Sequence, residues 1–276
     1  MARFVFWNMA RKPQLTLASA IIHQNQVDFF LTAEFGGEGA QFAESLTTGG
    51  RSFQFHPSRV TKGMSLFYAT QSCHVRLLAD LPRTAAYEIQ GAGGGEPVLL
   101  FLVHLPSKLY QSPEDQTAIA GSLAAGVRRF ELQRGTDRTI VVGDFNMSPF
   151  ENGMIGAREL HGVCSASIAA EGARNVRGQV YPYFYNPAWA LIASRRHETP
   201  GTHFYTRSGH YEHFWHTFDQ VLIRPGLMDA FDLDALRIVT SAGEMSLLDS
   251  RGRPDMIRAS DHLPILFDLD IECGVR

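Results

Sequence analysis

The sequence is poor in cysteine, in long apolar runs and in excess positive charge. Its three cysteines, Cys73, Cys164 and Cys273, lie far apart and form no C-x-x-C pair, which argues against a disulfide framework and against a thiolate zinc site. No apolar stretch approaches the roughly 18 residues of a membrane-spanning helix, and the N-terminal apolar run is too short for a secretory signal. We therefore expect no membrane partner and a reducing compartment, most simply the cytoplasm.

The balance of charge argues against a further class of protein. Lysine and arginine total 25 residues against 28 aspartates and glutamates, a net charge of −3. An overall basic nucleic-acid-binding protein is therefore not expected, although a local basic patch is compatible with this balance. No internal repeat and no linker divides the 276 residues, of which 45% are hydrophobic. This length and composition suit one large core, and we predict a single domain over residues 1–276.

Short apolar runs predict many strands and few helices. The clearest helix signal is Ser112 as an N-cap, followed by Pro113 and two acids, with Gly135 at the far end. A second helix is predicted from Pro13 to about Asn25. Strands are predicted at 3–7, 53–56, 64–70, 74–79, 85–90, 98–104, 139–144, 218–223 and 263–271, with a further apolar run at 27–34. This order is not a regular β-α-β alternation, so it favours two packed sheets with helices on their outer faces.

Polar residues stand where these apolar runs end or begin. The members of this set are Asn8, Glu34, His104, Asp144 with Asn146, Asp219, and Asp261 with His262. Turn chemistry alone would also select glycine and serine there. If the strands lie side by side, their ends meet at one rim, which is where open α/β sheets bind ligands. Alternation along a strand further predicts that Asp144 and Asn146 point to the same side.

Six short motifs carry a resemblance to a known family. They are FWN at 6–8, AE at 33–34, VHLPS at 103–107, GDFN at 143–146, FDQVL at 218–222 and SDHLP at 260–264. In this order they resemble the endonuclease/exonuclease/phosphatase superfamily, to which deoxyribonuclease I belongs, and they span nearly the whole chain. The resemblance implies a four-layer α/β sandwich in which two central mixed β-sheets are flanked by helices. It also implies metal-dependent cleavage of phosphate esters.

The resemblance assigns three residues to a metal site. Asn8, Glu34 and Asp261 map to the positions that hold the cation. Carboxylate and amide oxygens suit Mg²⁺, the expected cofactor, with Mn²⁺ as the alternative. Ala10 departs from the abasic-site nucleases, which carry an acid at that position, so the metal shell resembles other branches of the family more closely.

The same resemblance assigns five catalytic residues. Asp144 maps to the residue that orients or deprotonates the attacking water, and Asn146 maps to an amide that contacts phosphate or water. His262 maps to the histidine that contacts the scissile phosphate or activates water, and Asp219 fixes its ring. His104 would bind phosphate or donate a proton to the leaving group. No glutamate near residues 62–64 matches the one that pairs with this histidine in deoxyribonuclease I.

Three weaker signals leave alternatives open. The histidines at positions 203, 210, 213 and 216 are either a zinc cluster or loop histidines near the active rim, and their spacing favours the second reading. The aromatic residues at 181–189, with Arg195 and Arg196, either stack on bases or pack on the sandwich, and packing is favoured. Scattered basic residues are candidate phosphate contacts, although solvated charge is the default: Arg11, Lys12, Arg51, Arg59, Lys62 and Arg207.

The leading functional hypothesis is a Mg²⁺-dependent phosphodiesterase, a nuclease that cleaves DNA or RNA, with nucleic acid as its partner. The alternative is a phosphatase or phosphodiesterase that acts on a small-molecule or lipid phosphate ester. A binding module that keeps the fold without catalysis is a third hypothesis. The complete set of water-activating residues argues against this third hypothesis.

Overall fold

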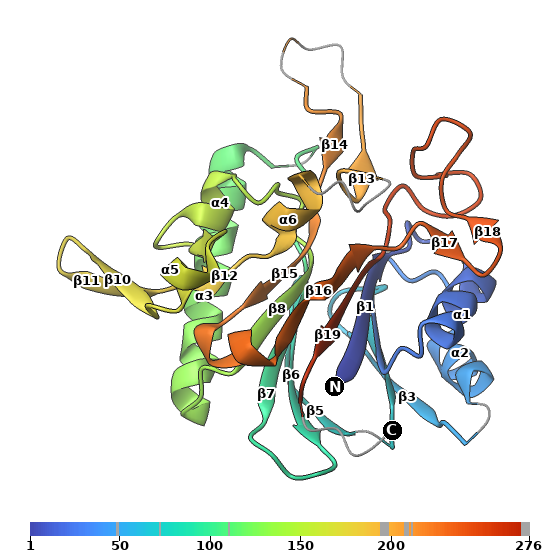
Figure 1. Cartoon of the computed structure of the whole chain (residues 1–276), viewed down its shortest axis with the longest axis horizontal. Helices are drawn as coiled ribbons and strands as arrows, with labels where there is room; N and C mark the ends of the chain where they lie inside the picture. Colours follow the sequence, from blue (N-terminus) through green and yellow to red (C-terminus); the bar gives the residue numbers. More distant parts are fainter. Residues whose placement is uncertain are drawn as a thin grey trace.

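Two large β-sheets pack face to face and form the centre of the computed structural model (Figure 1). The structure describes residues 1–47, 50–71, 73–109, 111–193, 199–206, 210 and 212–271. Four residues discussed above, Arg195, Arg196, Arg207 and Cys273, lie outside this part. None of the helices in the described part is both long and apolar enough to cross a membrane.

The first sheet has six strands, and the second has seven. The first runs in the order β16 (Phe231–Ile238), β19 (Ile265–Leu269), β1 (Ala2–Asn8), β2 (Phe29–Ala33), β4 (Ser65–Ala69) and β3 (Phe53–Pro57). The second runs in the order β5 (Cys73–Leu81), β6 (Thr84–Gly91), β7 (Val98–His104), β8 (Thr139–Asp144), β15 (Asp219–Ile223), β12 (Phe184–Tyr185) and β9 (Gly162–Val163). Both sheets are mixed, because β1 pairs with β2 in parallel and β7 pairs with β8 in parallel.

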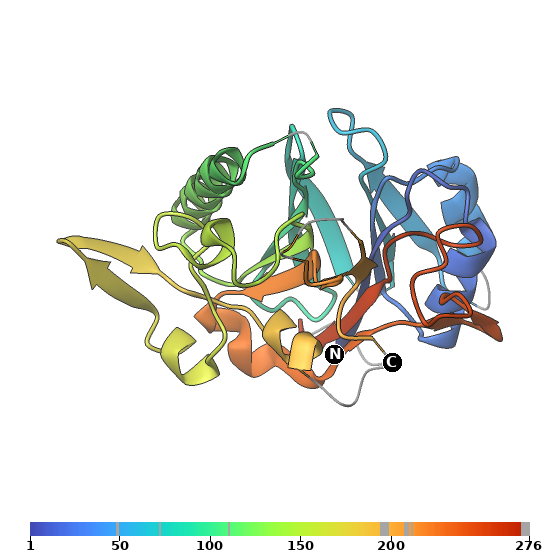
Figure 2. The same ribbon diagram turned by 90° about the horizontal axis from the view of Figure 1, so that it is seen from above.

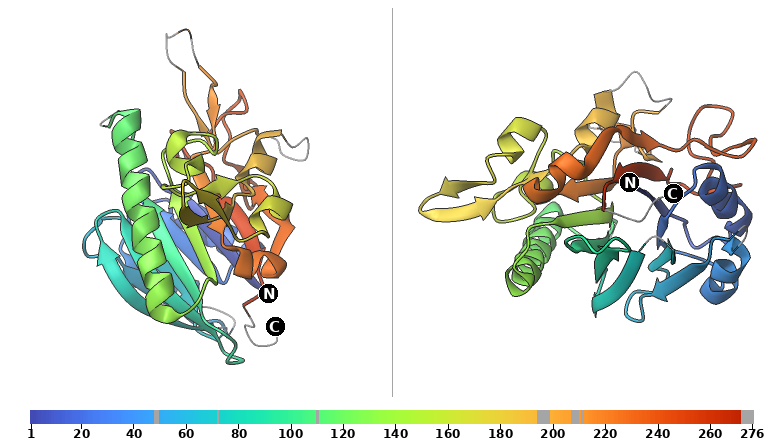
Figure 3. Two further views of the ribbon diagram at one scale, coloured as in Figure 1. Left: turned by 90° about the vertical axis from the view of Figure 1, so that its left-hand side faces the viewer. Right: turned by 60° about the horizontal axis from the view of Figure 1, so that its bottom comes forward.

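Helices cover the outer faces of the two sheets, which completes the predicted four-layer α/β sandwich (Figures 1 and 3). Helices α1 (Leu15–Gln24) and α2 (Gly39–Leu46) lie beside the first sheet, and α3 (Pro113–Arg134) runs along the second. Shorter elements are α4 (Asn152–Ile155), α5 (Ala166–Ala169), α6 (Ala188–Ala193) and the 3₁₀ helix η1 (Pro225–Ala230). Three hairpins complete the list: β10 (Ala173–Val176) with β11 (Gln179–Pro182), β13 (His203–Phe204) with β14 (Trp215–His216), and β17 (Ser241–Ala242) with β18 (Met245–Ser246).

The core between the sheets explains why the central strands are apolar on both faces. Phe4 of β1 stacks on Phe29 of β2 and on Phe267 of β19, with ring centroids 4.4 and 5.1 Å apart. These three residues are register partners on adjacent strands, and cross-strand aromatic pairs of this kind stabilise a sheet. A strand buried on both faces reads as a continuous apolar run, which is how these strands appear in the sequence.

Several predicted boundaries were wrong by a few residues, and several elements, among them α2 and β16, were not predicted. The first helix begins at Leu15 instead of Pro13, and the apolar run at 27–34 forms a strand only over Phe29–Ala33. Helix α2 lacks a side-chain N-cap hydrogen bond, so its start carries no sequence signal. Among the described strands, β16 pairs only with β19, and it carries exposed Leu233. An edge strand of this kind does not show the apolar run of a central strand.

The predicted start of α3 is confirmed and supplies a stability test. Ser112 Oγ accepts a hydrogen bond from the Asp115 backbone N–H at 3.1 Å, and the Asp115 carboxylate accepts one from the Ser112 N–H at 3.2 Å. Replacing Ser112 with alanine removes this cap and should lower the free energy of unfolding by about 1 kcal/mol. Urea denaturation measures this change. The control is Ser122→Ala inside the same helix, which should be neutral or stabilising because alanine has the higher helix propensity. Equal losses in both variants would contradict the capping role.

Candidate active site

The polar residues singled out in the sequence gather at one rim of the sandwich. Asn8 is the last residue of β1, and its register partner Ala33 precedes Glu34 on parallel β2. His104 and Asp144 are register partners at the ends of parallel β7 and β8. Asp219 begins β15, which runs antiparallel to β8, so it pairs with Asp144 as well. The ends of neighbouring parallel strands lie at the same edge of a sheet, and an antiparallel neighbour begins at that edge. These side chains are therefore brought to one edge of the two sheets.

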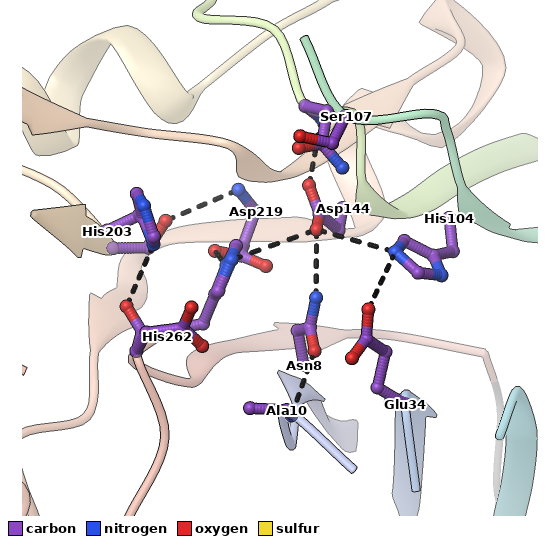
Figure 4. Close-up of polar contacts among 12 residues, drawn as sticks. Asn8, Ala10, Glu34, His104, Ser107, Asp144, His203, Asp219 and His262 are labelled. Atoms are coloured by element: carbon purple, nitrogen blue, oxygen red, sulfur yellow. Dashed lines mark hydrogen bonds and ion pairs between the residues drawn. The ribbon is translucent and has the colours of Figure 1, made fainter. Parts of the chain in front are cut away.

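Three hydrogen bonds join this rim to the rest of the site. Asn8 Nδ2 donates to Asp144 Oδ2 at 2.9 Å and so bridges the first sheet to the second (Figure 4). Trp7 Nε1 donates to the His262 carbonyl oxygen at 2.9 Å, and Ser260 Oγ donates to the Asn8 carbonyl oxygen at 2.7 Å. The loop of the SDHLP motif is therefore fixed against the end of β1. Each of these donors is buried with its acceptor, so breaking the contacts would leave unpaired groups.

The prediction that Asp144 and Asn146 alternate along one strand is wrong. Strand β8 ends at Asp144, and Asn146 has a left-handed φ of 51°, so the two residues do not alternate along one strand. Both nevertheless line the same cavity. The Asn146 N–H donates to Asp144 Oδ1 at 2.8 Å, and Asn146 Nδ2 donates to the Leu105 carbonyl oxygen at 2.9 Å. A tight turn holds the pair, and Phe145 is buried in the core beneath.

His262 and Asp219 form a buried pair. Nδ1 of His262 donates to Asp219 Oδ2 at 2.8 Å, and Nε2 lies 3.9 Å from Asp144 Oδ2 (Figure 4). Burial disfavours the charged ring, but the charges of Asp219 and Asp144 and the hydrogen bond outweigh it and raise the pKa of His262 to about 10. His262 is therefore an imidazolium at neutral pH. Because Nδ1 is engaged by Asp219, Nε2 is the nitrogen that faces Asp144.

His104 lies between two carboxylates. Its Nε2 atom is 3.6 Å from Glu34 Oε1 and 3.9 Å from Asp144 Oδ2. Two carboxylates, those of Glu34 and Asp144, therefore stand where a protonated His104 ring would find counter-charges. The Glu34 backbone has a left-handed φ of 50°, and its second oxygen, Oε2, lies 3.4 Å from Arg11 Nε. A non-glycine residue in this region is uncommon and is often found at functional sites.

His203 is the residue of this site whose position the sequence did not reveal. Its ring lies 4.5 Å from the His262 ring, and its Nδ1 donates to the Asp261 carbonyl oxygen at 2.9 Å. Burial and the charge of His262 lower the pKa of His203 to about 4, so this ring is neutral at pH 7. The signal available in the sequence was weak, because His203 stood among four histidines at irregular spacing.

The zinc-cluster alternative gains no support in the described part of the chain. Of the four histidines, only His203 takes part in a group with metal-ligand geometry, together with Asp261 and His262. His216 instead contacts the Glu212 carboxylate at 3.2 Å. The aromatic residues at 181–189 pack into the sandwich, as favoured above. Tyr181, Tyr183, Phe184 and Tyr185 are each at most 8% exposed.

A cavity of about 1040 Å³ is lined by all of the predicted site residues except Asp219, which is buried behind His262. Its lining includes Asn8, Glu34, His104, Asp144, Asn146, Asp261 and His262. Carboxylate and amide oxygens dominate this floor, and such donors fit a hard divalent cation. The amide oxygen of Asn8 also accepts a hydrogen bond from the Ala10 N–H at 3.1 Å. The described groups with ligand atoms within 4.8 Å of one another are His203–Asp261–His262 and Asp144–Asp219–His262. Glu34 belongs to neither group and lies beside His104, with Oε1 3.6 Å from His104 Nε2.

A family model described as "Endonuclease/Exonuclease/phosphatase family" matches residues 5–262. The chain belongs to this family. Its members are phosphoester hydrolases that depend on divalent metals, which agrees with the oxygen-rich floor of the cavity. The predicted resemblance and the predicted fold are both confirmed.

Solved structures with the same fold act on different substrates. The endonuclease domain of TRAS1, a telomere-specific non-LTR retrotransposon, is 14% identical with a TM-score of 0.56, and the match covers 98% of this chain and 99% of that one. The human Nocturnin catalytic domain is 16% identical with a TM-score of 0.57, covering 97% and 93%. A mannosyl-6-phosphatase from Bacteroides thetaiotaomicron is 12% identical with a TM-score of 0.56, covering 98% and 99%. A search of curated proteins gives no match. At such identities the likeness shows the fold and leaves the substrate open.

Proposed function

We propose that the chain is a divalent-metal-dependent phosphodiesterase, with nucleic acid as its substrate and Mg²⁺ or Mn²⁺ as its cofactor. The observation that carries this proposal is the network in which Asp144 accepts from Asn8 across the two sheets while facing His262 and His104. Binding alone would not require a buried carboxylate positioned between two imidazoles. A fixed carboxylate within reach of a bound water can serve as the general base for water attack.

Each residue has a role in this proposal that follows from its contacts. A bound cation would neutralise phosphate oxygens as a Lewis acid, and Glu34, Asn8 and Asp261 would hold it. Asp144, fixed by two donated hydrogen bonds, orients the attacking water and takes its proton. The Asn146 amide has a second hydrogen that is not needed for Leu105 and can contact the water or a phosphate oxygen.

The two histidines would stabilise the charge that develops on the phosphate. His262 presents Nε2–H as an imidazolium, with Asp219 holding the opposite side of the ring. A preorganised cation at this position stabilises the transition state more than the substrate. His104 lies on the other side of Asp144 and would contact a phosphate oxygen or the leaving group.

Metal removal tests the proposal directly. Protein treated with EDTA should lose all activity, and added Mg²⁺ or Mn²⁺ should restore it, because the carboxylates of the cavity floor repel phosphate unless a divalent cation is bound among them. The substrates to compare are plasmid DNA, single-stranded DNA, RNA, bis-p-nitrophenyl phosphate and inositol phosphates. We expect metal-dependent cleavage of nucleic acid and of bis-p-nitrophenyl phosphate. Cleavage of inositol phosphates with every nucleic acid untouched would reject a nuclease.

A second candidate is a hydrolase of a small-molecule or lipid phosphate ester. The charge of the cavity lining favours it, because the lining holds six carboxylates and only three lysines or arginines. The carboxylates are Glu34, Asp144, Glu212, Asp249, Asp255 and Asp261, and the cations are Arg11, Lys108 and Arg253. Such a lining suits one phosphate better than a long polyanion. The same substrate panel separates the two candidates.

A further inference from the structure

We propose that the substrate is a single strand of nucleic acid, recognised by a cationic ridge on one side of the cavity and an apolar wall on another. This inference rests on the proposed function and names its substrate class. The cationic ridge consists of Arg11, Arg59, Lys62 and Arg83. The apolar wall consists of Phe204, Tyr205, Met256 and Ile257. A strand would place its phosphates along the ridge and its bases against the wall.

The ridge is built on a rigid pair of turns. The Asp80 carboxylate accepts hydrogen bonds from Ser58 Oγ and from the Arg59 N–H, both at 2.6 Å. The Arg83 N–H donates to Thr61 Oγ1 at 2.7 Å. These bonds tie the turn before β4 to the turn between β5 and β6. The basic side chains of both turns are therefore presented from a fixed backbone.

The ridge lies directly beside Glu34. The Phe35 N–H donates to the Gly63 carbonyl oxygen at 2.8 Å. Gly63 has a φ of 83°, and a Cβ there would come within 2.9 Å of Glu34 Cα, so only glycine permits this approach. Arg11 contacts the Glu34 carboxylate from the solvent side, and its side chain is 83% exposed.

The charges of the ridge are available to a ligand. Arg59, Lys62 and Arg83 are exposed, and no carboxylate of the described chain lies within 4.0 Å of their charged nitrogens. Arg11 pairs with Glu34, and Arg83 Nη1 donates to the His104 carbonyl oxygen at 3.4 Å, so Arg59 and Lys62 are the cations of the ridge most open to a phosphate backbone. The acidic lining of the cavity itself does not extend to these turns.

The apolar wall is formed by the loop before β19 and the β13–β14 hairpin. Met256 and Ile257 are 65% and 86% exposed and line the cavity. Asp255 Oδ1 accepts from the Ile257 N–H at 3.0 Å, and Lys12 Nζ donates to the Met256 carbonyl oxygen, so the loop is held in place. The Arg253 guanidinium lies 4.2 Å from the Phe204 ring centroid and joins the loop to the hairpin. Tyr205, 37% exposed, continues the wall on the hairpin side.

The placement of the ridge and the wall favours one strand over two. Seen from above, the light-blue turn before β4 and the red loop before β19 lie on different sides of the rim (Figure 2). A single strand exposes base faces that can stack on aromatic and apolar side chains. A duplex hides those faces and carries a second backbone, which would meet the wall beside Asp249 and Asp255. Repulsion between these carboxylates and the second backbone disfavours the duplex.

The test compares one fluorescein-labelled oligonucleotide as a single strand and as a duplex, alongside bis-p-nitrophenyl phosphate, with Mg²⁺ or Mn²⁺. The ridge variant is Arg59→Gln with Lys62→Gln, and the wall variant is Met256→Ser with Ile257→Ser. The controls are Arg129→Gln and Leu132→Ser, two exposed positions of α3 outside the cavity lining. Circular dichroism confirms that each variant is folded.

We expect the wild type to cleave the single strand at least about tenfold faster than the duplex. The ridge variant should lower kcat/KM on the single strand by about tenfold. It should also reduce the slope of log(kcat/KM) against log[salt] by roughly one to two. The wall variant should raise KM by about tenfold with the salt slope unchanged. Both variants and both controls should cleave bis-p-nitrophenyl phosphate at the wild-type rate.

Several results would overturn this inference. Equal or faster cleavage of the duplex is one, and equal losses on the oligonucleotide and on bis-p-nitrophenyl phosphate are another. Preferential cleavage of phospholipid vesicles with the same dependence on Met256 and Ile257 would assign the wall to a lipid. In each of these cases phosphodiester cleavage still stands. Failure to cleave any substrate, bis-p-nitrophenyl phosphate included, would overturn the proposed function itself.

Discussion

Replacing Asp144 with asparagine should lower kcat by about three orders of magnitude while the protein stays folded. Asp144 is 1% exposed and faces both His262 and His104 across 3.9 Å. Asparagine has the same shape and can still accept the hydrogen bond from the Asn146 N–H, so the turn is kept. It cannot take a proton from water at neutral pH, and loss of a general base costs about 10²–10⁴ in rate.

Kinetics on bis-p-nitrophenyl phosphate with Mg²⁺ measure this loss. This small phosphodiester does not depend on the contacts that a nucleic acid would make away from the reacting phosphate. Asp229→Asn, at an exposed position of η1, is the matched control and should keep the wild-type kcat. Near-ultraviolet circular dichroism should be the same for both variants. If the kcat of Asp144→Asn were within a few-fold of the wild-type value, Asp144 would not be the residue that activates water.

The parts of the fold that were predictable are those in which local signals and tertiary packing agree. Strands β7 and β8 end where the sequence predicted, because each is an apolar run stopped by a polar residue, His104 or Asp144. Helix α3 carries a cap, a first-turn proline and a terminal Gly135 with a left-handed φ of 63°. Helix α2 and strand β16 have none of these signals and take their form from the sheets they pack on or pair with.

The residues that form the site could be predicted from the sequence, but their arrangement in space could not. The motifs pointed to the residues that line the cavity, yet the register of β8 against β7 and β15, which aligns Asp144 with His104 and Asp219, depends on strand pairings far apart in sequence. The same holds for His203, whose contact with His262 arises because the β13–β14 hairpin is bridged to the SDHLP loop. Strand pairings between residues so far apart in the sequence cannot be read from local composition.

Replacing Asp219 with asparagine should produce the second large effect, a fall in kcat of about 10²–10⁴. Asp219 is fully buried, and its carboxylate holds Nδ1 of His262 at 2.8 Å. A neutral amide at this position leaves the imidazolium without its closest counter-charge, so the pKa of His262 should fall well below about 10. The ring would then lose the Nε2–H charge that faces Asp144 and the phosphate.

Two measurements on the metal-free protein separate this electrostatic effect from simple damage. Ring ¹⁵N shifts of His262 at pH 8 should show an imidazolium in the wild type and a neutral ring in Asp219→Asn. Because the folded pKa is raised above the ordinary 6.5, the stability that this histidine contributes is complete below pH 6.5 and is lost as the pH rises toward 10. The stability of the variant should lack this decline.

The control for Asp219 is Asp268→Asn, which breaks another buried carboxylate pair, the one between Asp268 and Arg3 at 2.6 Å. It lies on β19 among core strands outside the cavity lining, so the variant should lose stability because the buried Asp268 carboxylate loses its ion pair with the partly exposed Arg3. It should nevertheless keep the wild-type kcat wherever it is folded. If Asp268→Asn and Asp219→Asn lowered kcat equally, the effect of Asp219 would be one of stability, and the orientation of His262 would not depend on its charge.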